Sequence, residues 1–296
     1  MFDLRYHVAS LAAVFFALVI GILVGVALAS HGLGNTERKR LEDDLRRARN
    51  DAQILQAQVD ALDVAGAANG AFVDNTYEAV MENRLKGKRI AVLFVGKIDG
   101  NVRSAITRAI GDAGGGQPVR LWVVKVPVDP AAITKQLASR PPFLAAYAGR
   151  SQLVDLGHAL GQEFVAGKDT PLWNTLQTLL VEEKVGTAKR PADGVVLVRT
   201  AAPQTGATAL FLQGLYSGLK DVGEPAVGVE RSADDGSAIK AFQEMHLSTV
   251  NDIDKPIGKL ALAILLGNPQ FAGDYGSSPA GQWLPNVPPV TTTTGG

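Results

Sequence analysis

The 296-residue sequence contains no cysteine. This absence excludes a disulfide framework, a thiolate metal site and a cysteine nucleophile. An excess of either charge sign is also missing, because Lys plus Arg and Asp plus Glu each number 29. A nucleic-acid-binding domain shows a basic excess, so we expect no nucleic-acid partner.

Metal ligands are scarce as well. Beyond the first residue, the histidines and methionines are His7, His31, Met81, His158, Met245 and His246. They form no HxH or HExxH spacing, and copper(I) prefers several soft ligands together. The pair Met245-His246 follows a short predicted helix, where a core methionine and a helix-end charge explain it better. The sequence therefore predicts no metal site and no cofactor.

Catalytic fingerprints are missing too. The turn after the first predicted strand, residues 95–100, reads VGKIDG, which is neither GxGxxG nor GxxxxGK[ST]. No GxSxG motif marks a hydrolase nucleophile. We therefore predict no catalytic residues, and an enzyme ranks lowest among the functions considered.

What the sequence does contain is a long apolar run at residues 8–30, after a polar lead at residues 1–7. A single helix of about 20 apolar residues crosses a bilayer core. Ala27-Leu28-Ala29 before Ser30 resembles a signal cleavage site, so a signal that is removed after Ala29 is the alternative. Because the run is longer than a usual signal core, we predict an uncleaved transmembrane signal-anchor helix.

Small residues recur at every fourth position of this apolar run. Such residues let two helix backbones approach closely in lipid, and the set includes a GxxxG pair. The predicted helix-pairing interface consists of Ala13, Ala17, Gly21, Gly25 and Ala29. The alternative is that Gly and Ala are simply frequent in membrane helices.

A heptad pattern follows at residues 36–65. Residues 31–35 contain two glycines and are expected to end the first helix, after which Thr36 caps a second one. The unbroken 4-3 spacing over about three heptads predicts a coiled coil and favours a homodimer or higher oligomer. Its seam consists of Leu41, Leu45, Ala48, Ala52, Leu55, Val59 and Leu62. The alternative is an amphipathic helix that lies on its own domain, and residues 64–70 read as a hinge in either case.

Residues 70–272 predict an α/β globular domain. Short apolar runs near residues 89–95, 118–126, 194–198, 225–229 and 247–250 indicate buried strands. Segments with helical periodicity separate them, including 101–112, 145–166, 171–184 and 207–221. This alternation predicts a mostly parallel sheet covered by helices on both faces, a Rossmann- or flavodoxin-like class.

Two segments remain near the C-terminus. Residues 251–254 read NDID after the last predicted strand, where ligands gather in open parallel sheets. We instead expect Asp252 or Asp254 to cap the helix that begins near Pro256. Residues 273–296 are rich in Gly, Ser, Pro and Thr, so we predict a disordered tail.

The beginning MFDLRYHVASLAAVFFALVIGILVG, the heptad segment and the STVNDID segment at residues 248–254 followed by Gly258 resemble the actinobacterial copper transporter family, the MctB family. The resemblance runs from Phe2 to about Tyr275. It implies a cell-envelope protein of copper homeostasis, with copper as the species handled although no ligand cluster is visible. It also implies that the globular domain is extracytoplasmic, whereas Lys and Arg residues within 38–47 favour the cytoplasm by the positive-inside rule.

Two functions follow from these features. The first is a membrane-anchored cell-envelope protein of the copper transporter type, involved in copper homeostasis or efflux. The alternative is a structural or scaffolding envelope protein whose coiled coil and α/β domain bind a protein partner. A transmembrane barrel does not fit, because it needs many segments of about ten alternating residues.

Overall fold

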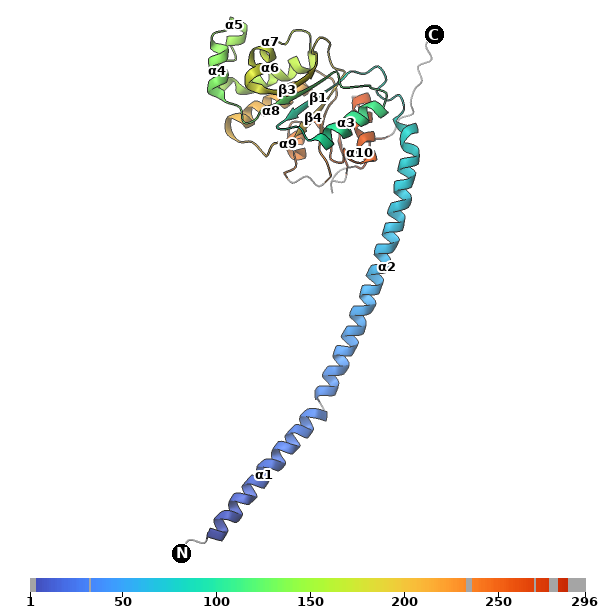
Figure 1. Cartoon of the computed structure of the whole chain (residues 1–296), viewed down its shortest axis with the longest axis vertical. Coiled ribbons are helices and arrows are strands. Elements are labelled where there is room, and N and C mark those ends of the chain that lie inside the picture. The colour runs from blue at the N-terminus through green and yellow to red at the C-terminus, as the bar shows by residue number, and fades with distance from the viewer. Residues whose placement is uncertain (1–3, 32, 233–235, 269, 277–281, 287–296) are drawn as a thin grey trace. The chain divides into compact units, whose positions relative to one another are not determined.

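The structure, a computed structural model, describes residues 4–31, 33–232, 236–268, 270–276 and 282–286. The chain divides into two compact units, Met1–Gly70 and Ala71–Gly296. The first consists of helix α1 (Leu4–His31) and most of helix α2 (Leu33–Met81), both visible as long coils in Figure 1. The second contains all the strands.

Helix α2 corrects two predictions about the segment after the apolar run. Thr36 does not cap a helix, because α2 already begins at Leu33. The helix also does not end within residues 64–70, because it continues through Gly66 and Gly70 to Met81. Alanine surrounds these glycines in the sequence, and its high helix propensity offsets a cost of about 1 kcal/mol for each glycine.

The second unit is a mixed α/β domain. Its 7-stranded sheet has the order β3-β2-β1-β4-β5-β6-β7, and only β3 runs antiparallel to its neighbour. The strands are β1 (Ile90–Val95), β2 (Arg120–Val124), β3 (Val181–Gly186), β4 (Gly194–Arg199), β5 (Ala226–Val229), β6 (Ser248–Val250) and β7 (Asp274–Tyr275). The helices are α3 (Gly100–Asp112), α4 (Pro130–Ala138), α5 (Pro142–Ala145), the 3-10 turn η1 (Arg150–Gln152), α6 (Leu153–Ala166), α7 (Pro171–Leu180), α8 (Gly206–Lys220), α9 (Ile239–Glu244) and α10 (Pro256–Gly267).

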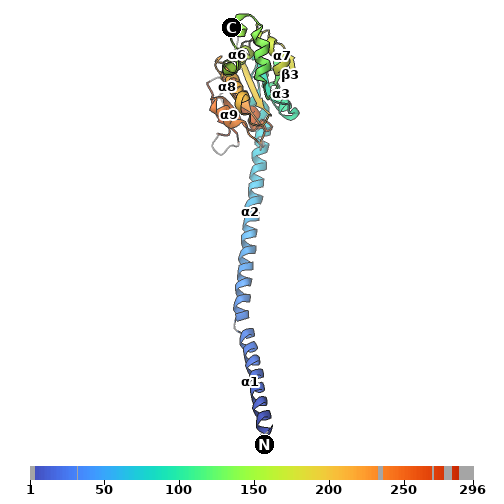
Figure 2. The same ribbon diagram turned by 90° about the vertical axis from the view of Figure 1, so that its left-hand side faces the viewer.

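Successive side chains of the central strands point to opposite faces of the sheet, so a hydrophobic core forms on each face. In β1, Leu93 joins the cluster formed with α4 to α8, while Val92 and Phe94 join the cluster formed with α3 and α10. Figure 1 shows α3 and α10 on the opposite side of the strands from α4 to α8, and Figure 2 shows the same domain turned by 90°. The prediction of a mostly parallel sheet flanked by helices is confirmed.

Helices α6 and α8 cross at very short range because both carry glycine pairs at the crossing. A Cβ added at Gly214 would lie 1.9 Å from the carbonyl oxygen of Val154, and one at Gly218 would lie 2.0 Å from that of His158. On the facing helix, a Cβ at Gly157 would lie 2.2 Å from the Phe211 carbonyl oxygen, and one at Gly161 would lie 2.5 Å from that of Leu215. Backbone therefore packs on backbone, and no side chain fits between them.

Two predictions about secondary structure were wrong. Residues 181–184 belong to β3 rather than to the preceding helix, which ends at Leu180. The tail is not irregular from residue 273, because Asp274 and Tyr275 pair with β6 as β7 and Leu284 packs on the core. The Thr249 hydroxyl donates to the Asp274 carboxylate at 2.6 Å, which helps to hold β7. Residues 277–281 and 287–296 of the predicted tail lie outside the described residues.

Candidate functional site

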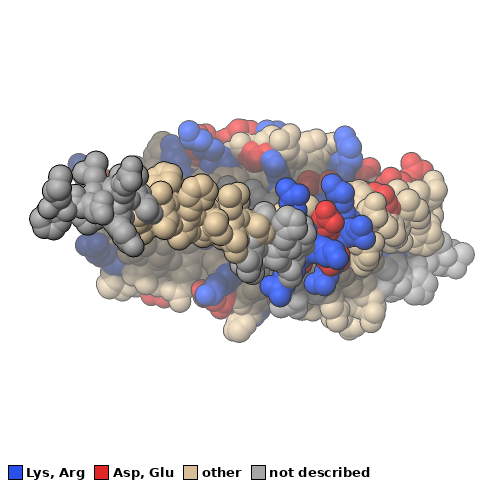
Figure 3. Space-filling model, turned by 90° about the horizontal axis from the view of Figure 1, so that it is seen from below, with Lys and Arg blue, Asp and Glu red and all other residues tan. Residues whose placement is uncertain are grey.

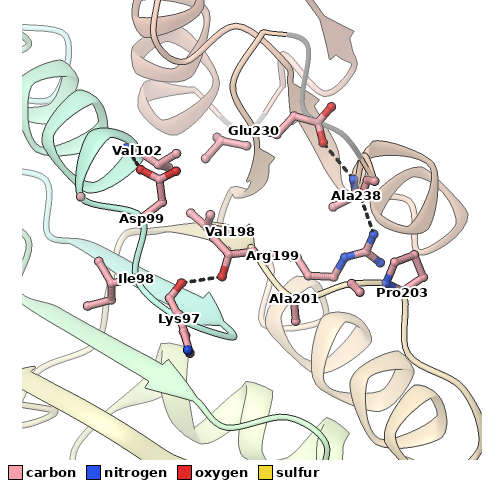
Figure 4. Close-up of a pocket in the computed structure, with 15 residues that line it drawn as sticks. Lys97, Ile98, Asp99, Val102, Val198, Arg199, Ala201, Pro203, Glu230 and Ala238 are labelled. Atoms are coloured by element: carbon pink, nitrogen blue, oxygen red, sulfur yellow. Dashed lines mark hydrogen bonds between the residues drawn. The ribbon is translucent and has the colours of Figure 1, made fainter.

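A crevice opens at the carboxyl ends of β1, β4 and β5. The chain leaves β1 on one side toward β2 and later returns on the other side with β4, so the strand order reverses between β1 and β4. Ligands of open parallel sheets bind at such switch points. The crevice has a volume of about 550 Å³ and is lined by the loops after these three strands and by the start of α9. Its lining residues are drawn in Figure 4.

Ionisable side chains line this crevice, and local hydrogen bonds hold them in place. The Asp99 carboxylate accepts from the amides of Asn101 and Val102 at 2.8 and 3.1 Å and so caps α3. Its other oxygen lies 3.6 Å from the Arg231 guanidinium. Asp99 therefore neutralises the partial positive charge at the N-terminus of α3, and this helix end does not offer a binding site for an anion.

On the opposite side of the crevice, a carboxylate and a guanidinium hold the start of α9. Glu230 is buried and accepts from the Ser237 hydroxyl at 2.7 Å and the Ala238 amide at 2.8 Å. Arg199 donates to the carbonyl oxygens of Gly236 and Ser237 at 3.3 and 3.0 Å. Figure 4 shows both groups reaching toward the α9 segment. The crevice is thus preformed and polar, with most of its charged groups already engaged.

The NDID segment supports the rim of the crevice. Ser232 donates its hydroxyl to Asp252 at 2.8 Å, and the Ser232 amide donates to Asp254 at 2.8 Å. Neither aspartate caps α10, whose N-cap is Lys255 without a side-chain cap bond, so the capping prediction was wrong. The reason is the fully buried position of Asp252, which faces the β5 loop and an ammonium of Lys255 at 3.2 Å. A Cβ at Gly258 would lie 1.9 Å from the Asp252 carbonyl oxygen, so this motif requires glycine there.

Within a single chain, the structure places no partner against the predicted pairing residues. Ala13, Ala17, Gly21 and Gly25 are exposed, and a Cβ built at either glycine meets nothing within 4 Å. The backbone of Ala29 is helical, but its side chain lies outside the described residues. Every seam residue of α2 is also exposed: Leu41, Leu45, Ala48, Ala52, Leu55, Val59 and Leu62. Both interfaces stay predictions.

Metal ligands do not converge in the part of the chain that the structure describes. No group of three or more His, Asp or Glu side chains there could hold a metal ion. Met245 follows α9 and packs against the core, and His246 has a positive φ of 55°. His158 instead pairs with Asp221 at 2.9 Å, and this contact lowers the pKa of the Asp221 carboxyl.

Sequence reasoning missed the residues that line the crevice. Lys97 and Asp99 follow β1, Arg199 ends β4 and Glu230 follows β5, so each lies at the carboxyl end of a strand. That shared position was a usable signal, since carboxyl ends of parallel strands meet at one edge. A search limited to glycine fingerprints overlooks it.

The first unit holds one helix long and apolar enough to cross a membrane, within Ser10–Ala27, among the described residues. Figure 3 shows the described part of α1 without charged side chains, whereas blue and red ones are mixed along α2. Together with the second unit, these features define a class: an α/β domain joined through a long helix to a membrane-type apolar helix.

Comparison with known proteins narrows this class to one family. The family described as "Copper transport outer membrane protein, MctB" matches residues 1–285, so the chain belongs to the MctB family. Proteins named "Copper transporter MctB" from Mycobacterium bovis and Mycobacterium tuberculosis are each 24% identical to it over 309 aligned residues. The alignments cover 94% of this chain and 96% of each relative.

Proposed function

We propose that the protein acts in copper homeostasis as a membrane-anchored component of the cell envelope. The observation that carries this proposal is the family match over residues 1–285, which includes both the apolar helix and the α/β domain. The relatives named copper transporters align with the chain at nearly full length. The family name is thus supported by the whole architecture rather than by one shared segment.

We place the α/β domain outside the cytoplasm. The family description as an outer membrane protein supports this orientation. Arg38, Lys39 and Arg40 near the end of α1 favour the opposite one, but long domains translocate largely regardless of flanking charge. A phosphatase fused after residue 296 is expected to be active, and a fluorescent protein fused there to be dark. The reverse pattern would contradict this orientation, and a phosphatase fusion to residues 71–296 alone serves as the inactive control.

We further propose that copper is handled through an assembly or partner rather than at a site within one chain. This view is supported by the scarcity of soft ligands in the sequence and by the engaged charges of the crevice. The full chain in detergent, titrated with copper(I) against a chelator, is expected to leave the metal with the chelator. Stoichiometric capture of copper(I) by the chain would contradict this part of the proposal.

Growth of a deletion strain tests the functional assignment. Removal of the gene is expected to lower tolerance to added copper, and the full chain supplied in trans is expected to restore it. Tolerance to zinc provides the control, because it should not change. A deletion strain with normal copper tolerance would instead favour a structural envelope protein that binds a protein partner, a role that the exposed seam of α2 also suits.

A further inference from the structure

The seam of α2 is an apolar face that the single chain leaves uncovered. Leu41, Leu45, Leu55, Val59 and Leu62 are between 49% and 71% exposed. They recur in the 4-3 pattern of a coiled coil, with Ala48 and Ala52 completing the line. A face of this spacing fits another helix of the same spacing.

Charges beside the seam indicate what that helix is. With Leu45 at position a and Leu41 at position d, Asp44 occupies position g and Arg49 occupies position e. In a parallel, in-register pair, a g residue faces the e residue of the next heptad on the other helix, so Asp44 would face Arg49 of the partner subunit. The two-fold symmetry of such a pair repeats the contact, so it occurs twice in the dimer. Both side chains are exposed, and Asp44 forms an ion pair within its own chain at 3.7 Å with Arg47, whose side chain is also exposed.

The remaining flanking positions are compatible with the same register. Asp51 would face Gln56, and Gln58 would face Asp63, so neither contact brings two like charges together. At the N-terminal end, Glu37 would face Glu42, and Arg38 at the adjacent a position supplies the opposite charge. In this register the Asp44–Arg49 contacts are attractive, the Glu37–Glu42 contacts are repulsive, and the other two flanking pairs bring no like charges together.

Membrane anchoring fixes the relative direction of two such helices. Helix α2 begins at Leu33, and α1 ends at His31. Two copies anchored by α1 in one membrane begin α2 at the same surface, which makes the helices parallel and in register. This step rests on the proposed anchoring function.

We propose that the occupant of the seam is a second copy of this chain, paired in parallel along Leu41–Leu62 and set in register by Asp44 and Arg49. The small-residue stripe on α1, which includes Gly21 and Gly25, would extend the contact into the bilayer. The proposal assigns an interface on α2 and leaves the crevice of the α/β domain free for another ligand.

Because the chain contains no cysteine, single cysteines report the interface directly. In the full chain in membranes, Ala48→Cys and Ala52→Cys lie on the seam and are expected to form disulfide-linked dimers on mild oxidation. Asn50→Cys occupies position f on the opposite face and is the matched control that should stay monomeric, since disulfides require Cα atoms within about 7 Å. Equal cross-linking at all three positions, or none at any, would overturn the proposal.

Charge reversal tests the register in the Ala52→Cys background. Asp44→Arg and Arg49→Asp each convert two attractive contacts into two repulsive ones, which we expect to shift the monomer–dimer equilibrium roughly tenfold toward monomer. The double variant carrying both reversals should regain the cross-linking of the parent. Reversals without effect, or a double variant as weak as the single ones, would overturn the assigned register.

The same gel separates this inference from the proposed function. A chain cut after Ala29 would migrate faster and leave the membrane fraction, which would contradict the anchor. An intact, membrane-bound chain that fails to cross-link would contradict only the pairing. Copper tolerance of the deletion strain does not depend on either result.

Discussion

The glycine crossing of α6 and α8 gives a prediction that the structure makes quantitative. In Gly214→Ala, the new Cβ would lie 1.9 Å from the Val154 carbonyl oxygen and 3.0 Å from the His158 amide nitrogen. Both neighbours are backbone atoms of α6, so no side-chain rotation relieves the overlap. The two helices must separate, and the core beneath them must loosen.

The expected loss of folding stability is the difference between two opposing free-energy contributions. Overpacking of this kind typically costs about 1–3 kcal/mol. Alanine in place of a helical glycine stabilises the helix by about 0.5–1 kcal/mol. At the middle of both ranges the net loss is about 1 kcal/mol, which lowers the Tm of a domain of about 150–250 residues by roughly 2–4 °C.

Thermal unfolding of the full chain in detergent measures this loss through tryptophan fluorescence. Trp122 and Trp173 are fully buried in the core cluster that α6 and α8 cover. Gly111→Ala is the matched control, because that helical glycine is exposed and a Cβ there meets nothing within 4 Å. We expect the control to keep or slightly raise the Tm. Equal Tm values for Gly214→Ala and Gly111→Ala would refute the account of the crossing.

Three further predictions concern ion pairs and buried polar groups. Asp193 accepts two bonds from the Arg89 guanidinium, at 2.9 and 2.6 Å, which lower the pKa of its carboxyl. The resulting stability is present above the unfolded pKa and is lost as pH falls through the folded one. Asp193→Asn should therefore destabilise the chain at pH 7, and chemical denaturation over a pH series should show the difference shrinking only below about pH 4, the ordinary pKa of an aspartate; a difference that stays constant down to the lowest pH would contradict this. Buried Arg120 donates to the carbonyl oxygens of Phe164, near the C-terminus of α6, and of Arg190. Arg120→Met should lower the free energy of unfolding by about 1–3 kcal/mol in the same denaturation assay. An unchanged midpoint would contradict the role of Arg120 in satisfying these carbonyl groups. Ser232→Ala removes the hydroxyl that lies within hydrogen-bond distance of both aspartates of the NDID segment and donates to one of them. Protease cleavage near this loop should then accelerate by roughly 5–10-fold, for about 1 kcal/mol of lost local stability, whereas an unchanged rate would contradict a supporting role for Ser232.

Much of the sheet was predictable because its strands are short apolar runs bounded by turn residues. Residues 90–95 are buried on both faces, which is why their sequence is continuous rather than alternating. The antiparallel strand β3 escaped prediction for the opposite reason. It follows directly on α7 and exposes Glu182 and Glu183, so its pattern continues that of a helix.

The long helix and the crevice show different limits of sequence reasoning. Gly66 and Gly70 suggested the end of the helix and a hinge, because each glycine disfavours a helix when it is considered alone. The alanines on either side favour the helix strongly enough for it to continue. The spacing of Gly157 with Gly161, and of Gly214 with Gly218, was visible in the sequence but carries no signal for which helices meet. The crevice depends on sheet order, and sheet order is a property of long-range pairing that the local pattern does not specify.

The pairing inference also bears on how one anchored chain acts in copper handling. A single apolar helix cannot enclose a path through a membrane, and each chain has one such helix among its described residues. Association along α2 would bring two anchors together at one place. A variant that carries Gly21→Ile and Gly25→Ile should weaken association in a membrane two-hybrid assay, and an unchanged signal would remove the stripe from the interface.

The proposed function implies that this chain limits the amount of copper that cells hold. The most direct measurement is the copper content of washed cells by mass spectrometry, in the parent strain, the deletion strain and the deletion strain supplied with the full chain. Our account predicts that copper rises in the deletion strain at moderate external copper and returns to the parental value when the chain is restored, while zinc content stays constant. Equal copper content in all three strains would contradict it.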